Sequence, residues 1–144
     1  MNVKQLMGDR KPADIETISE NATLADAASR LSARKIGALM VSKDDGGVAG
    51  ILSERDIVRR VASDGAGALA TLVSAAMTAN VVSCGPTDLA HSLLQRMTEG
   101  RFRHMPVIED GSLIGIISIG DVVKAHISEI EMEKEAMENM IRGM

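Results

Sequence analysis

Residues 50–58 read Gly-Ile-Leu-Ser-Glu-Arg-Asp-Ile-Val, and residues 115–123 read Gly-Ile-Ile-Ser-Ile-Gly-Asp-Val-Val, 65 positions further along the chain. The glycine, the first isoleucine, the serine, the aspartate and the final valine are identical in the two stretches. The similarity extends upstream, where residues 36–41 match residues 102–107 in pattern and residues 3–7 match residues 73–77. A duplication of this length indicates one supersecondary unit present twice.

Each copy has a hydrophobic pattern that predicts the element order β-α-β-β-α. The first copy predicts strands at residues 15–18, 36–41 and 48–52, and a helix at residues 24–34 with Thr23 as its N-cap. The second copy predicts strands at residues 80–83, 103–108 and 113–117, and a helix at residues 89–99 ended by Gly100. A further helix is predicted to start at the Ser-x-x-Asp of each copy.

The predicted unit leaves one face of its sheet bare, so we expect two copies to bury their bare faces against each other with pseudo-two-fold symmetry. The expected fold class is therefore α/β (α+β). The expected division is repeat 1 at residues 1–65, repeat 2 at residues 66–127 and a C-terminal helix extension at residues 128–144. The apolar stretch at residues 66–77 is too short to span a membrane and is predicted to be a short buried helix.

The composition limits the classes of partner. The net charge is -4, which disfavours non-specific binding to nucleic acid or to an anionic membrane. The chain has no Trp, no Tyr and one Phe, so it cannot build an aromatic platform for single-stranded nucleic acid. We therefore expect neither a nucleic-acid partner nor a membrane partner.

Cys84 is the one cysteine of the chain, which excludes an intrachain disulfide. A reducing compartment suits this usage, and residues 1–10 lack the apolar core of a signal peptide, so the expected location is cytoplasmic. A redox-sensor role for Cys84 is the alternative to a purely structural thiol.

The duplicated unit resembles the cystathionine β-synthase-type (CBS) domain, and the tandem resembles a CBS pair, or Bateman module. The resemblance covers about residues 3–127 and rests on Gly-x-x-Ser-x-x-Asp in both copies and on Arg-His-Met-Pro-Val at residues 103–107. It implies a stand-alone, bacterial-type regulatory module that holds an adenosyl ligand in the cleft between its repeats.

Taken alone, Ser118 and Asp121 are typical of a helix cap, with the serine as N-cap and the aspartate in the first turn. The resemblance gives the same residues, and Ser53 with Asp56 in the first copy, a binding role. It implies that each aspartate accepts hydrogen bonds from the ribose hydroxyls while each serine hydroxyl holds the phosphate end. An ionised carboxylate suits this role because it only accepts hydrogen bonds and a cis-diol offers two donors.

The remaining site residues are also implied by the resemblance. Arg103 and His104 are expected to attract phosphate, the alternative being solvated charge at a sheet edge, and Arg55 is expected to compensate in part in the first copy. The adenine pocket is assigned to Met105 and Pro106 and to the backbone of Val81, Val82, Ser83, Thr17 and Ile18. The first copy has Gly37, Ala38 and Met40 where the second has Arg103, His104 and Pro106, so we expect the second site to be the stronger.

The expected function is that of a non-enzymatic sensor of AMP, ADP or ATP, with NAD or S-adenosylmethionine less favoured. No Walker loop is present, and His91, His104 and His126 lack the spacing of metal ligands. The alternative is a structural homodimerisation module with no physiological nucleotide. The helix predicted at residues 121–144 carries the apolar residues Ile127, Ile130, Met137 and Ile141, which we interpret as a homodimer contact rather than a solvated tail. An unknown effector protein is expected to receive the signal.

Overall fold

The computed structural model describes residues 1–143 of the chain and divides into two compact units. One unit consists of Asp14–Val81. The other combines Met1–Ala13 with the chain from Val82 onward. A short 3-10 helix, η1 (Pro12–Asp14), stands where the chain first passes from one unit to the other.

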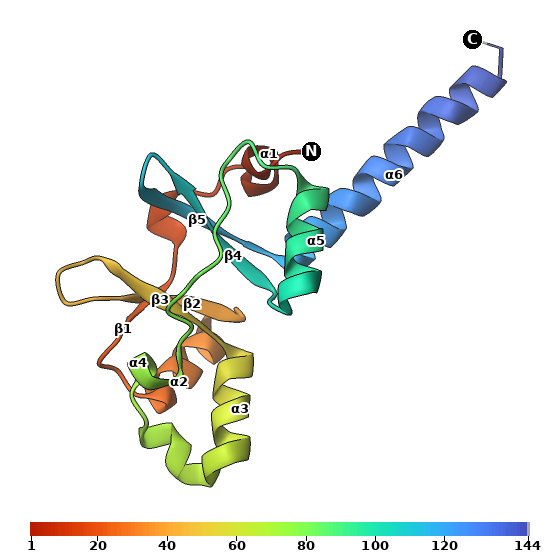
Figure 1. The fold of residues 1–144 in the computed structure, drawn as a ribbon. Coiled ribbons are helices and arrows are strands. Elements are labelled where there is room, and N and C mark those ends of the chain that lie inside the picture. The colour runs from red at the N-terminus through yellow and green to blue at the C-terminus, as the bar shows by residue number, and fades with distance from the viewer. Residues whose placement is uncertain (144) are drawn as a thin grey trace. The chain divides into compact units, whose positions relative to one another are not determined.

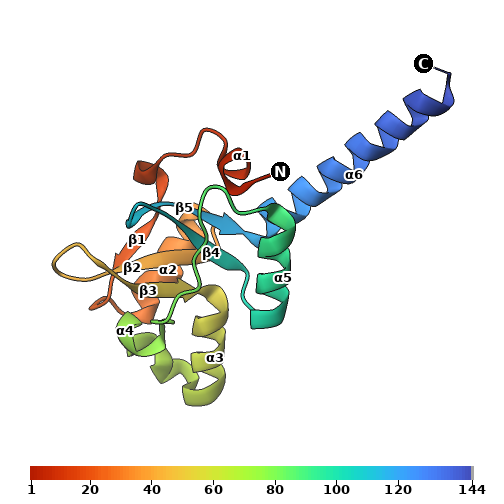
Figure 2. The same ribbon diagram turned by 45° about the horizontal axis from the view of Figure 1, so that its top comes forward.

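The unit Asp14–Val81 contains a three-stranded sheet in the order β1 (Thr17–Ser19), β2 (Ala38–Ser42) and β3 (Val48–Ser53). Strand β1 is parallel to β2, and β2 is antiparallel to β3. Its helices are α2 (Leu24–Arg34), α3 (Glu54–Asp64), the 3-10 helix η2 (Gly65–Ala70) and α4 (Val73–Ala76). Ile18, Leu24, Leu39, Leu52 and Val73 are buried in its core, and Figures 1 and 2 show α2 beside the sheet.

The other unit is built on the antiparallel hairpin of β4 (His104–Glu109) and β5 (Ser112–Ser118). Its helices are α1 (Val3–Met7), α5 (Ala90–Gly100) and α6 (Ile119–Ile141). Helix α5 lies alongside the hairpin and the first turns of α6 (Figure 1). Val3, Leu93, Met105, Ile117 and Val122 are fully buried in this second core.

The first helix of each sequence repeat packs on the strands of the other repeat. Helix α1 contacts β5, and Met7 covers Gly115, where an added Cβ would come within 2.7 Å of the Met7 methyl group. Helix α4 contacts β3, and Gly50 lies against the chain that follows α4, where an added Cβ would come within 2.3 Å of the Thr78 carbonyl oxygen. The repeated glycine of the motif thus permits a close approach, and each compact unit contains residues of both sequence repeats.

The predicted helix at residues 24–34, its Thr23 cap and both paired strand hairpins are confirmed. The prediction of a strand at residues 80–83 was wrong, because only a single parallel bridge between Cys84 and Val107 forms there. The stretch 66–77 is not one buried helix but parts of η2 and α4, in which Ala68 and Val73 alone are buried.

The prediction of Gly100 as the C-cap of its helix was also wrong. Gly100 is the last residue of α5, and Arg101 takes the left-handed conformation with a φ of 57°. Gly100 instead lies against the Phe102 side chain, and a Cβ there would come within 2.3 Å of the ring unless the ring moved.

Helix α6 begins at Ile119 and ends at Ile141, so it starts two residues before the predicted helix; Met144, the predicted end, lies outside the described residues. Only Val122 and Ala125 of this helix are buried, and its C-terminal part extends away from the hairpin (Figure 1). Within residues 1–143, no helix combines the length and apolar character needed to cross a membrane.

Candidate functional site

The Ser-x-x-Asp of the second repeat forms a complete capping box at the start of α6. The Asp121 amide donates to the Ser118 hydroxyl at 3.2 Å. In return, Asp121 Oδ2 accepts from the Ser118 amide at 2.8 Å and from the Ser118 hydroxyl at 3.0 Å. The cap therefore uses one carboxylate oxygen of Asp121 and leaves Oδ1 to other partners.

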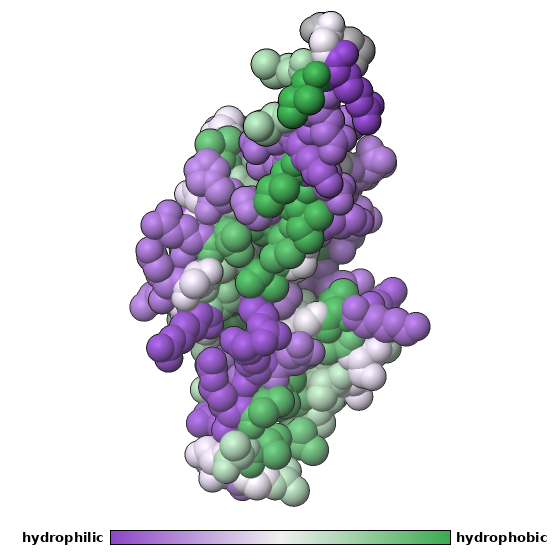
Figure 3. All heavy atoms as spheres, turned by 90° about the vertical axis from the view of Figure 1, so that its right-hand side faces the viewer, coloured by the Kyte–Doolittle hydropathy of each residue, from purple (hydrophilic) through white to green (hydrophobic). Residues whose placement is uncertain are grey.

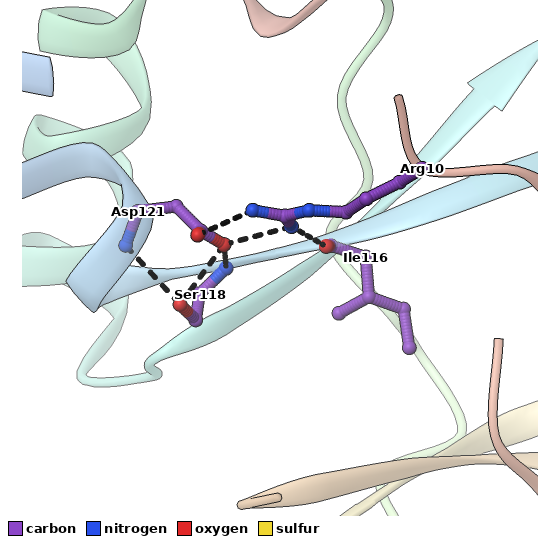
Figure 4. Close-up of polar contacts among 4 residues, drawn as sticks. All are labelled: Arg10, Ile116, Ser118 and Asp121. Carbon is purple, nitrogen blue, oxygen red and sulfur yellow. Dashed lines mark hydrogen bonds and ion pairs between the residues drawn. The ribbon is translucent and has the colours of Figure 1, made fainter. Parts of the chain in front are cut away.

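Arg10 is the partner of the remaining oxygen. Its guanidinium donates to Asp121 Oδ1 at 2.5 Å and to Oδ2 at 3.0 Å, and it also donates to the carbonyl of Ile116 at 3.2 Å (Figure 4). Burial by itself would raise the pKa of Asp121, but the hydrogen bonds from Arg10 and Ser118 outweigh it and place the pKa below its ordinary value. Asp121 is therefore ionised at neutral pH.

The first repeat has the same cap without the arginine fork. Asp56 Oδ2 accepts from the Ser53 amide at 2.8 Å and from the Ser53 hydroxyl at 3.1 Å. Asp56 Oδ1 lies 3.6 Å from the Arg59 guanidinium, which is too long for a hydrogen bond. Both repeats thus present a carboxylate near a helix start with one oxygen held by the cap.

The expected phosphate residues lie beside the second motif. His104 is the register partner of Ser118 in the hairpin, and the Arg103 carbonyl accepts from the Ile119 amide at the start of α6 at 2.8 Å. The expectation that the Ser118 hydroxyl donates to phosphate meets a physical obstacle, because its one proton is already directed at Asp121.

Three of the seven residues expected to form the adenine pocket have buried side chains. The side chains of Ile18 and Met105 are 3% and 0% exposed, and Pro106 is buried, so these side chains do not line an open surface. Val81 belongs to the unit Asp14–Val81, whereas Val82 and Ser83 belong to the other unit. The assignment of these seven residues to adenine stays a prediction.

Two arginines hold the backbone that was expected to read adenine. Arg30 of α2 donates to the Thr17 carbonyl, and Arg96 of α5 donates to the Ser83 carbonyl at 3.1 Å. They occupy corresponding places in the two repeats, and no local sequence pattern indicates this role. Arg55 of the first repeat is exposed and lines a shallow hollow with Glu54, Val58 and Arg59.

Arg10 is the main residue of the site that sequence reasoning missed. It lies 111 positions from Asp121, outside the duplicated motif. The one available signal was its place after the first copy of the repeated segment Val-x-x-x-Met, where the second copy has Asn80. Among residues 1–143 there is no group of three His, Cys, Asp or Glu side chains arranged to hold a metal ion.

Two repeats of a helix, an antiparallel strand pair and a second helix, each with a capped aspartate at the start of the second helix, define a tandem domain. Comparison with known proteins agrees, since the CBS domain model matches residues 3–63 and again residues 73–128. This chain therefore belongs to the CBS domain family and contains two copies of the domain. CBS pairs are regulatory modules, and the relatives described next are named for their CBS domains rather than for a reaction.

CBS domain-containing protein CBSCBSPB2 of Arabidopsis thaliana is 36% identical over 119 residues, which are 83% of this chain and 22% of that protein. The chain thus spans less than a quarter of that relative's length. The crystal structure of the CBS-domain containing protein ATU1752 from Agrobacterium tumefaciens is 49% identical, with a TM-score of 0.82 over 87% of this chain and 92% of that chain. CBSX2 in complex with AMP is 23% identical, with a TM-score of 0.70 over 88% of this chain and 96% of that one, which shows a shared fold.

Proposed function

We propose that this chain is a regulatory module that binds an adenosine nucleotide, AMP, ADP or ATP, at its Ser-x-x-Asp motifs. The observation that carries the proposal is that the helix cap uses only one of the two carboxylate oxygens of each aspartate. Capping engages Oδ2 of Asp56 and of Asp121, so the cap does not account for Oδ1. An ionised carboxylate at a helix start, with an acceptor that the cap does not use, is suited to the two donors of a ribose diol.

Further support comes from the surroundings of the second motif. Arg103 and His104 lie beside the N-terminus of α6, where backbone amides and the helix dipole favour an anion. The first motif has Gly37 and Ala38 in their place. The structure of CBSX2 with AMP adds that a protein of this fold accommodates such a nucleotide.

Isothermal titration calorimetry with AMP, ADP and ATP tests the proposal. Asp121→Ala should weaken binding at the second motif by about 1.5–3 kcal/mol, the range for hydrogen bonds to a charged group. Asp56→Ala is the matched change at the first motif and separates the two sites. Unchanged affinity in both variants would reject the role of the carboxylates in ribose binding.

The composition provides a simple first observation. Because the chain has no Trp and no Tyr, the purified protein should absorb little at 280 nm, and a band near 260 nm would report a co-purified nucleotide. A thermal-shift screen then separates this proposal from the alternative of a structural dimerisation module. A ligand present at about 100 times its Kd should stabilise the protein by about 2.7 kcal/mol.

We also propose that the chain forms a homodimer through α6. Ile127, Ile130, Met137 and Ile141 are 52–83% exposed on this helix, and Figure 3 shows apolar side chains among hydrophilic ones on the face of the molecule to which α6 extends. Burying this stripe favours association. Light scattering on the paired change Ile127→Ser and Ile130→Ser should show a lower molar mass than wild type, whereas Glu131→Ser on the same helix should not.

A further inference from the structure

Arg10 forms a bidentate ion pair with Asp121, the carboxylate that the proposed function assigns to ribose binding. The side chain comes from the segment that follows α1, and its two terminal nitrogens approach the two oxygens of Asp121 as a fork (Figure 4). A third hydrogen bond, to the Ile116 carbonyl, fixes the plane of the guanidinium against β5. Bidentate pairing of this kind is stronger and more directional than a single charged contact.

The contacts on Asp121 fill Oδ2 and engage one of the two lone pairs of Oδ1. Oδ2 accepts three hydrogen bonds, two from Ser118 and one from Arg10, and Oδ1 accepts one from Arg10. A carboxylate offers about four lone-pair positions in all. The two that Ser118 uses maintain the helix cap, and Oδ1 has one further lone pair, so a diol with two donors must take at least one of the positions that Arg10 now holds.

The first motif provides an internal comparison. Its cap is the same, but the cation near Asp56 Oδ1 is Arg59, which is 3.6 Å away and whose side chain is 68% exposed. The position that corresponds to Arg10 is Asn80, which carries no charge. The bidentate contact is therefore a property of the second motif and not of the first.

The local structure allows Arg10 to leave without disturbing the core. Helix α1 is anchored by the buried side chains of Val3 and Met7, whereas the Arg10 side chain is 41% exposed. Gly8, between the helix and Arg10, has a φ of +56° and no neighbouring atom within 4 Å of its Cβ position. Rotation of the arginine side chain thus requires no movement of α1.

We propose that Arg10 is an internal competitor of the ligand, which holds Asp121 in the unliganded protein and must release it before a ribose diol can bind. The inference rests on the proposed function. By linkage, a ligand that displaces Arg10 frees the segment after α1 to the same extent that this segment opposes the ligand. A nucleotide that binds the second motif must therefore displace Arg10, whereas one that binds the first motif has no such competitor.

Adenosine is the probe that isolates this competition, because it has the ribose diol and no phosphate that a freed arginine could bind. Calorimetry is done in an Asp56→Ala background, in which only the second motif can bind. There, Arg10→Gln should tighten adenosine binding by about three- to tenfold, the worth of a partly exposed bidentate pair. The matched control is Arg59→Gln in an Asp121→Ala background, which should change the affinity of the first motif by less than about twofold.

The outcomes separate the two proposals. Equal or weaker adenosine binding by Arg10→Gln, with adenosine binding that still depends on Asp121, overturns the competitor and leaves the nucleotide function standing. Binding that depends on Asp56 and not on Asp121 also overturns it. If adenosine, AMP and ATP bind neither the wild-type protein nor the Arg10→Gln variant, the nucleotide function is rejected, and the proposed role of Arg10 as competitor is rejected with it. Thermal unfolding of each variant confirms that the titrated protein is folded.

Discussion

At the scale of single residues, Cys84 has the environment of a structural thiol rather than of a redox sensor. Its side chain is 5% exposed, and its sulfur lies 3.6 Å from the Pro106 carbonyl. Burial raises the pKa of the thiol to about 11, with the Asp88 carboxylate adding to the rise and Arg96 opposing it. Thiolate is the reactive form, so the alternative of a redox role kept open by the sequence is disfavoured.

We therefore expect the native protein to resist thiol reagents. At pH 8 about one Cys84 in a thousand would be a thiolate, and burial hinders access further. Ser83→Cys is the matched control, because position 83 is adjacent and exposed. Labelling with a chromogenic disulfide should modify one thiol of the Ser83→Cys variant quickly, whereas Cys84 should react slowly in both proteins until denaturant is added. Fast labelling of native wild-type protein would contradict the buried-thiol assignment.

The pair of Arg10 and Asp121 predicts a pH dependence of stability with a definite sign. The pKa of Asp121 is depressed in the folded protein, so the contribution of the pair is present above the unfolded value of about 4 and is lost as the pH falls through the lower folded value. A double-mutant cycle with Arg10→Gln and Asp121→Asn should give a coupling of about 0.5–1 kcal/mol at pH 7, given the exposure of Arg10.

Urea unfolding between pH 7 and pH 3 measures this coupling. It should decline as the pH falls below about 4, because Asp121 takes up a proton in the unfolded chain before it does so in the folded protein. The opposite trend, a coupling that grows as the pH falls, would show that another group governs the interaction. Arg59→Gln with Asp56→Asn repeats the cycle at the first motif, where the 3.6 Å separation predicts little coupling at any pH.

At the scale of elements, the two motif glycines should respond differently to the same added methyl group. An alanine at position 50 places its Cβ 2.3 Å from the Thr78 carbonyl oxygen, which belongs to a hydrogen-bonded bridge with Ile51. An alanine at position 115 meets the Met7 side chain, which can rotate. Gly50→Ala should therefore cost about 2–3 kcal/mol of unfolding free energy and Gly115→Ala less, within the range for overpacking.

Chemical denaturation of the two variants compares these costs. Gly67→Ala is the control, because its Cβ position is open and its φ is not positive. This control should change the free energy of unfolding by less than about 0.5 kcal/mol. If Gly50→Ala and Gly115→Ala lower the free energy of unfolding equally, the Met7 side chain does not move aside for the added methyl group, and the prediction is wrong.

The elements also show which features a sequence can predict. Helix α2, the caps at Thr23, Ser53 and Ser118, and the paired strands followed from periodicity and from contacts three residues apart. The pairing of Cys84 with Val107, the left-handed Arg101 and the Arg10 fork depend on tertiary contacts that no local pattern contains. The candidate aspartates were therefore predictable, whereas the partner that occupies one of them was not.

At the scale of the whole molecule, the chain is interleaved, because the unit Asp14–Val81 is inserted into the sequence of the other unit. Each sequence repeat consequently supplies a helix to the core built by the other repeat. Val3 of α1 is 0% exposed in the core around β4 and β5, and Val73 of α4 is 0% exposed in the core around β2 and β3. Neither half of the sequence contains all of the residues that cover its own sheet.

This connectivity predicts that fragments 1–65 and 66–144 fold together better than apart. Alone, fragment 66–144 lacks Val3 and Met7, and the loss of two such buried side chains costs several kcal/mol, a large part of the stability of a small domain. Mixing the fragments should restore helical circular dichroism beyond the sum of the separate spectra and give one cooperative melting transition. Val3→Asp in fragment 1–65 should abolish the rescue because it places a charge in the apolar core, whereas Lys4→Asp on the exposed side of α1 should preserve it. A fragment 66–144 that melts cooperatively by itself at the temperature of the intact chain would show that α1 is dispensable for that unit.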